Sequence, residues 1–254
     1  MKITIITLFP NMVSGFFNES IVKKAREKGL VEIELVNLRD FAIDSYGSVD
    51  DRPYGGGAGM VMRADVVYAA LERCNIKTSK GSKYRTLLTS PRGIQFSQKK
   101  AEEYSTLEHI VIIAGHYEGI DERVSEFVDE EVSLGDFVMT GGEMTAAAIT
   151  DSVVRLLPGV LKKDTATAEE SFSYASIIRI IEAVGENETL TALKKKGVDR
   201  VRLLEYPHYT RPEDFMNKKV PDVLLSGNHK EIEKWRIQKA FEETLKRRPD
   251  LLQL

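Results

Sequence analysis

The sequence predicts an α/β fold with a mostly parallel sheet and flanking helices, followed by a small helical C-terminal domain. Two observations support this prediction. In the first part of the chain, short apolar runs alternate with amphipathic stretches, which is typical of parallel strands covered by helices on both faces. After Gly159 the pattern changes to charged segments with helical periodicity.

Strands and helices are predicted in alternation along the first part of the chain. Apolar and alternating runs predict strands at residues 3–8, 30–37, 85–89 and 109–114. Amphipathic periodicity predicts helices at residues 21–28, 64–74, 97–105 and 143–157. Because a helix separates each strand from the next, parallel pairing is favoured over hairpins.

The C-terminal part is predicted to consist of a linker and three helices. Residues 166–176 are small and polar without a clear period and predict the linker. Short helices are predicted at residues 176–184 and 190–196, and a longer amphipathic helix at 231–247. The longer helix places five residues near one face, namely Ile232, Trp235, Ala240, Phe241 and Leu245.

Composition and charge restrict the class of protein. The formal net charge is −3, yet residues 194–254 carry 15 Lys and Arg against 10 Asp and Glu. A basic segment can follow phosphates, because each cationic contact releases counterions, although a solvated helical surface would have the same composition. Cys74 is the only cysteine, which excludes an internal disulfide. The first apolar run breaks at Pro10 and no run approaches the roughly 18 residues of a membrane span, so we expect a cytoplasmic protein without a membrane anchor.

Three glycine-bearing segments are candidates for ligand binding. The segment at residues 53–59 lacks the phosphate-binding spacing and by itself predicts a flexible loop. The segment at 114–123 follows a predicted strand directly, where α/β proteins bind ligands, although a turn before a helix would look the same. The segment at 133–143 is apolar and opens a helix, which suits an adenine site or a plain strand–turn–helix connection.

Seven strings in this order identify a resemblance. They are RPYGGGAGM, TSPRG, GHYEGIDERV, SLGDFVMTGGE, DSVVRLLPGVL, LEYPHYTRP and VLLSGNHKEIEKWR. Together they resemble the bacterial tRNA (guanine-N1)-methyltransferase family, from residue 1 to the C-terminus except between about 173 and 202. The resemblance implies a SPOUT fold with a trefoil knot, and an obligate homodimer with composite active sites. It also implies methyl transfer from S-adenosylmethionine to N1 of the guanine 3′ of the anticodon, position 37 of tRNA.

The resemblance also assigns the residues of the site. It implies that the knot binds S-adenosylmethionine mostly through backbone groups, at Leu88, Ser90, Pro91, Gly115, Gly119, Leu134, Gly135, Asp136, Phe137, Val138, Met139, Gly141 and Gly142. Guanine N1 carries a proton near neutral pH, so a base must remove it while a cation stabilises the charge that builds on O6. The family pattern places the base at Glu170, with Glu169 as the competitor, and the cation at Arg155. Glu118 matches an acid linked to activity and to a magnesium requirement, to which its neighbours Asp121 and Glu122 could also contribute. No carboxylate set has a recognised metal-ligand spacing.

The chain departs from the family pattern in three places. Residues 44–48 replace a stretch that is usually more basic, and Arg92 stands where glutamine is common. Residues 173–202 are an insertion that we expect to have structure of its own, near bound tRNA. We therefore divide the chain into a knotted domain at 1–162, a linker with its insertion at 163–202, and a helical tRNA-binding domain at 203–254. The alternatives are a knotted enzyme that methylates a ribose 2′-hydroxyl and a non-catalytic RNA-binding protein of the same fold.

Overall fold

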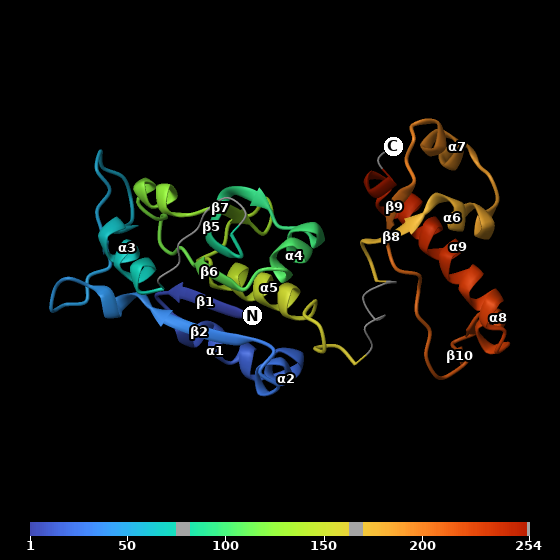
Figure 1. Cartoon of the computed structure of the whole chain (residues 1–254), viewed down its shortest axis with the longest axis horizontal. Helices are drawn as coiled ribbons and strands as arrows, with labels where there is room; N and C mark the ends of the chain where they lie inside the picture. Colours follow the sequence, from blue (N-terminus) through green and yellow to red (C-terminus); the bar gives the residue numbers. More distant parts are fainter. Residues whose placement is uncertain (75–81, 163–169, 253–254) are drawn as a thin grey trace. The chain divides into compact units, whose positions relative to one another are not determined.

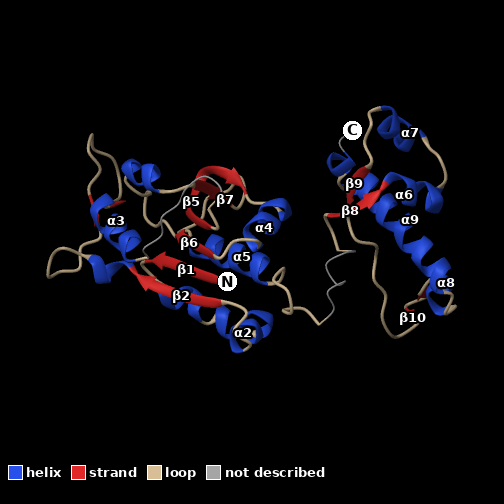
Figure 2. Cartoon of the chain, viewed as in Figure 1, coloured by secondary structure: helices blue, strands red, loops and turns tan. Residues whose placement is uncertain are grey.

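The computed structural model describes residues 1–74, 82–162 and 170–252, and the chain forms two compact units (Figures 1 and 2). The first unit is Met1–Lys162 and the second is Lys163–Leu254. The first unit ends at the same residue as the first domain of the sequence analysis. Each unit has its own hydrophobic core and is described by itself.

The first unit is built on a five-stranded sheet with the order β2-β1-β6-β5-β7, in which every neighbouring pair is parallel. The strands are β1 (Lys2–Thr7), β2 (Glu32–Asn37), β5 (Tyr84–Gln95), β6 (His109–Ile113) and β7 (Glu130–Ser133). This confirms the predicted mostly parallel α/β fold with flanking helices. The threading of a trefoil knot stays a prediction.

Helices cover both faces of the sheet because alternate strand residues point to opposite sides. On one face Ile3 and Ile5 pack against helices α1 (Pro10–Ser14), α2 (Ser20–Glu27), α4 (Gln98–Ser105) and α5 (Glu143–Val154). On the other face Ile6 and Ile113 pack against α3 (Ala64–Arg73) and the 3₁₀ turns η2 (Leu38–Phe41) and η3 (Glu122–Phe127). A short antiparallel pair, β3 (Asp50–Asp51) and β4 (Val61–Met62), precedes α3, and the 3₁₀ turn η1 (Phe16–Asn18) precedes α2.

Strand β5 runs beyond the predicted residues 85–89 because it crosses close to β7. Its register against β7 shifts between Thr89 and Ile94. A Cβ on Gly93 would overlap the backbone of Glu131 and Val132, so only glycine permits the crossing. The bulge leaves residues 90–92 outside the regular ladder at the carboxyl side of the sheet.

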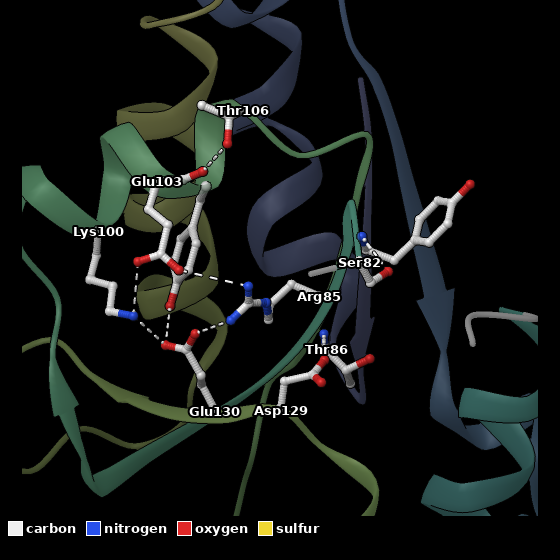
Figure 3. Close-up of polar contacts among 10 residues, drawn as sticks. Ser82, Arg85, Thr86, Lys100, Glu103, Thr106, Asp129 and Glu130 are labelled. Carbon is white, nitrogen blue, oxygen red and sulfur yellow. Dashed lines mark hydrogen bonds and ion pairs between the residues drawn. The ribbon is translucent and has the colours of Figure 1, made fainter. Parts of the chain in front are cut away.

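An ionic cluster joins α4 to the edge of the sheet (Figure 3). The Glu130 carboxylate on β7 accepts hydrogen bonds from Arg85 Nη1 at 2.6 Å, Lys100 Nζ at 2.8 Å and the Tyr104 hydroxyl at 3.0 Å. Glu103 lies beside both cations, 3.7 Å from Arg85 and 3.1 Å from Lys100. Burial opposes ionisation of Glu130, but the hydrogen bonds from Lys100 and Tyr104, together with the charges of Lys100 and Arg85, lower the pKa of its carboxyl.

The second unit combines helices with a two-stranded antiparallel sheet of β8 (Ser173–Ser176) and β9 (Arg200–Leu203). Its core is formed by β9, α6 (Ile177–Val184), α7 (Glu188–Lys195) and α9 (His229–Arg247). The remaining elements are the β10 (Asp214–Phe215) and β11 (Lys218–Lys219) pair, α8 (Asp222–Leu225) and the 3₁₀ turn η5 (Pro249–Leu252).

Two details of the second unit correct the sequence analysis. The predicted linker at 166–176 is wrong over its last four residues, which form β8 through pairing with a strand far along the chain. The predicted apolar face of the long helix is right for Ala240 and Phe241 but wrong for Leu245, which is 41% exposed. Thr244 takes the buried position instead, and its hydroxyl accepts a hydrogen bond from the Leu204 amide at 2.7 Å.

Candidate active site

Three loops at the carboxyl side of the sheet are joined by short hydrogen bonds. The Gly142 amide donates to the Gly115 carbonyl at 2.7 Å, and the Gly115 amide donates to Thr89 Oγ1 at 3.1 Å. An antiparallel bridge pairs His116 with Gly141. The bulged part of β5, the loop after β6 and the segment before α5 therefore form one assembly, at the edge where parallel α/β sheets bind ligands.

These loops enclose an open cavity of about 510 Å³, within the range of small-molecule sites. The predicted cofactor residues that line it are Leu88, Ser90, Pro91, Gly115, Gly119, Leu134, Gly135, Phe137, Val138, Met139, Gly141 and Gly142. Asp136 is exposed and does not belong to the lining. Sequence reasoning missed several polar residues of the lining, namely Thr89, His116, Tyr117, Ser125 and Thr145.

The glycines at 141 and 142 are packed against side chains below the cavity. A Cβ on Gly142 would overlap Thr89 Oγ1, and a Cβ on Gly141 would overlap His116 Nδ1 and the Glu143 carboxylate. Glycine is therefore required at both positions for the loops to approach one another. By contrast, a Cβ on Gly115 would meet its nearest atoms at 3.5 Å, an ordinary contact.

A fully buried acid lies under this floor. Glu143 begins α5, and its Oε1 accepts a hydrogen bond from Thr7 Oγ1 at 2.9 Å. Its Oε2 lies 3.5 Å from His116 Nδ1. A carboxylate in the first turn of a helix interacts favourably with the helix dipole. The contacts of Glu143 with Thr7 and His116 therefore join the start of α5 to the end of β1 and to the loop after β6.

Glu118 differs from its acidic neighbours. Asp121 receives two side-chain hydrogen bonds from Arg123, at 2.8 and 2.6 Å, and these lower the pKa of its carboxyl. Glu122 pairs with Arg92 at 2.8 Å, which raises the pKa of that guanidinium. Glu118 and Glu122 both line the cavity, so the acid selected from the sequence belongs to the lining.

The first glycine segment contacts Glu118. Gly59 has a φ of +84°, and a Cβ there would overlap the Glu118 side chain. The Glu118 amide donates to the Met60 carbonyl at 3.1 Å, and the Met62 amide donates to the Gly119 carbonyl at 2.9 Å. Residues 59–62 therefore contact the loop that carries Glu118, and Gly59 is the residue of the predicted flexible loop that takes part. Within residues 1–74, 82–162 and 170–252, no three His, Cys, Asp or Glu side chains are grouped as metal ligands.

The two remaining predicted residues are not part of the cavity lining, and Glu170 belongs to the other unit. Arg155 caps the C-terminal end of α5, whereas the cavity is at the other end of that helix. At 1.5 Å per residue, the twelve steps from Glu143 to Arg155 correspond to about 18 Å. Glu170 belongs to the second unit, where its carbonyl accepts a hydrogen bond from the Ser173 amide at 3.0 Å. Glu169 lies outside the described residues.

Comparison with known proteins gives one consistent result. Residues 1–254 match the family described as tRNA (Guanine-1)-methyltransferase TrmD. Similar proteins include the tRNA (guanine-N(1)-)-methyltransferases of Bacillus cereus strain AH820 and Bacillus anthracis strain A0248. Each is 48% identical over 254 residues, which is 100% of this chain and 92% of the relative. In the part of the chain that the structure describes, no helix has the length and apolarity to cross a bilayer.

Proposed function

Because the chain belongs to the tRNA (guanine-1)-methyltransferase family, of the SPOUT class, we propose that it methylates N1 of a guanine in tRNA with S-adenosylmethionine as donor. We further propose that the target is the guanine at position 37, 3′ of the anticodon. The observation that carries this proposal is the cavity formed by three loops, because nearly all the residues that the resemblance assigns to the cofactor line it.

The cavity suits S-adenosylmethionine in shape and in chemistry. Phe137, Val138 and Met139 present exposed apolar surface at its wall, which suits an adenine ring. The glycines of the floor allow backbone groups to approach a ligand closely. The ligand would supply an electrophilic methyl group on a cationic sulfur. The charged lining residues are Arg92, Glu118 and Glu122, of which Arg92 and Glu122 form an ion pair, so Glu118 gives the wall a net negative charge.

The proposed chemistry needs a base and a cation at the guanine. Glu170 takes the N1 proton, so that the N1 lone pair can attack, and Arg155 stabilises the negative charge that develops on O6. Glu118 is the third residue that we assign to the reaction, and a magnesium requirement would act through it. The competing base is Glu169, one residue earlier.

We propose that the active site is shared between two copies of the chain. The support is the length of α5, which separates Arg155 from the cavity of its own chain by about 18 Å. An arginine contributed by a second copy would not have to span that length. We expect the homodimer to act on tRNA in the cytoplasm, and the basic C-terminal part to contact the phosphates.

A methyl-transfer assay on unmodified tRNA transcripts tests the function. Transcripts with guanine at position 37 should accept labelled methyl groups, and transcripts with adenine at that position should not. Methylation mapped to a ribose 2′-hydroxyl would identify the related knotted enzyme instead. Absence of S-adenosylmethionine binding in calorimetry would identify the non-catalytic RNA-binding alternative.

A further inference from the structure

The sheet of β8 and β9 has two faces of different character, and only one of them is part of the core. Val201 and Leu203 are buried and, with Ala175, pack into the core of the second unit. Tyr174 and Arg202 are directly opposite each other in the antiparallel register, and therefore share the other face. Tyr174 is 54% exposed, and Arg200 on the same face is also exposed.

Tyr174 and Arg202 form a stacked pair. The Arg202 guanidinium lies 4.8 Å from the centre of the Tyr174 ring, within the range of cation–π contacts. Phe172 lies two residues before Tyr174, and the Arg248 guanidinium lies 5.8 Å from the centre of its ring. Arg248 is also paired with Asp250 at 2.7 Å, so it contributes little net charge. We call the surface made by Tyr174, Arg200 and Arg202 the tyrosine–arginine face.

This combination of groups matches single-stranded RNA. Unstacked bases bind to aromatic rings and guanidinium planes, and the nearby cations attract the phosphates. The face lies within the segment at 173–202, which also carries Lys195 and Lys196 at the end of α7. Charge complementarity therefore favours a polyanion as its occupant.

The position of the face specifies which part of the RNA it would contact. Tyr174 follows Glu170 by four residues, and the hydrogen bond from the Ser173 amide keeps Glu170 at the start of β8. Four residues span at most about 14 Å. We propose that the tyrosine–arginine face is an RNA-binding site that stacks an unpaired base of the anticodon loop next to the target guanine. The inference rests on the proposed function, because it takes tRNA as the substrate.

The test measures the affinity of the full chain for an unmodified tRNA transcript at several salt concentrations. Tyr174→Ala should weaken binding about 5- to 100-fold, the effect of losing one stacked base, without changing the salt dependence. Tyr174→Phe keeps the ring and should bind within about twofold of the unmodified chain. Affinity for S-adenosylmethionine and the melting temperature should be the same in all three proteins, because Tyr174 lies outside the core.

A charge-matched pair separates stacking from overall charge. Arg202→Gln removes the stacked guanidinium, whereas Lys194→Gln removes one positive charge from α7, where Lys194 is held by Glu186 at 3.0 Å. Arg202→Gln should weaken tRNA binding at least about fivefold more than Lys194→Gln does. Equal losses in the two variants would show that only overall charge matters, and would overturn the proposal.

The remaining outcomes also decide the question. Unchanged tRNA affinity in Tyr174→Ala overturns the proposal, and a simultaneous change in sedimentation would assign the face to a contact between copies. If the unmodified chain methylates tRNA while Tyr174→Ala binds it normally, the proposed function is supported and only the RNA-binding role of the tyrosine–arginine face is refuted. If Tyr174→Ala weakens tRNA binding but the unmodified chain methylates no guanine, the RNA-binding role of the face is supported and the proposed function is refuted.

Discussion

The ionic cluster around Glu130 provides a stability prediction whose size follows from its contacts (Figure 3). Glu130→Ala removes the acceptor of three hydrogen bonds, from Arg85, Lys100 and the Tyr104 hydroxyl. Tyr104 is fully buried, so its hydroxyl would lose its partner, at a cost of about 1–3 kcal/mol. Arg85 and Lys100 are partly exposed and keep Glu103 as a partner, so the loss of their ion pairs with Glu130 adds about 1 kcal/mol.

We therefore expect Glu130→Ala to lower the free energy of unfolding by about 2–4 kcal/mol. For a protein of this size the melting temperature should fall on the order of 5–10 °C. Urea denaturation followed by circular dichroism measures the first quantity, and a thermal scan the second. Glu103→Ala is the matched control, because Glu103 is 42% exposed and should cost less than about 1 kcal/mol. If the two variants lose the same amount, the buried carboxylate is not what anchors α4.

The same cluster predicts a pH dependence. The pKa of Glu130 is lowered in the folded protein, so the folded state binds its proton less readily than the unfolded state, where the pKa is about 4.3. The stabilisation is complete above the unfolded-state pKa and is lost as the pH falls through the lowered folded-state value. The stability difference between the unmodified chain and Glu130→Gln should therefore be constant from pH 6 to 7 and shrink below about pH 4. A difference that grows on acidification would refute the assigned sign.

Two further predictions concern the site. Gly141→Val should weaken S-adenosylmethionine binding at least about tenfold in calorimetry, because its side chain would overlap His116 and Glu143, whereas Gly15→Ala, with open space around it, should have no effect. Glu170→Gln should slow single-turnover methylation on the order of 10²-fold or more with little change in cofactor affinity, because the amide cannot accept the N1 proton. A dead Glu169→Gln beside an active Glu170→Gln would move the base by one residue, and two active variants would place it outside the linker.

The first unit was predictable from the sequence wherever local pattern decides the structure. The run IVII at 110–113 is apolar throughout and becomes the part of β6 that is buried on both faces. Strand β7 was not predicted, because EEVS has a single apolar residue and becomes a strand only through pairing with β5, some forty residues earlier. The cavity residues came from the family resemblance, and the resemblance could not reveal that Asp136 points away from the lining.

The segment at 173–202 shows where local pattern is insufficient. Its two helices were predicted from periodicity, but SYAS carries no strand signal and owes its structure to β9. A deletion of 173–202 looks from the sequence like a clean test of its role. The structure excludes that test, because Ile180, Leu190 and Val201 belong to the core of the second unit and their removal would unfold it. Point substitutions on the exposed face are therefore the appropriate experiment.

The geometry of α5 leads to a prediction about how many chains make one active site. The N-terminal end of α5 lies at the cavity, and Arg155 at its other end is about 18 Å away. If the site is completed by a second copy, each site takes Arg155 from one chain and Glu170 from the other. In a heterodimer of an Arg155→Ala chain and a Glu170→Gln chain, one site then carries both defects and the other carries none.

Confirmed heterodimers, purified through two different affinity tags, should therefore recover up to about half of the unmodified activity on tRNA, while either homodimer stays inactive. A heterodimer of Arg155→Ala with a chain carrying both substitutions is the control, because none of its sites is intact, and it should show no recovery. If each site were complete within one chain, every site in the first heterodimer would contain one defect. Absence of recovery in confirmed heterodimers would then show that Arg155 and Glu170 act from the same chain, whichever chain supplies the cavity.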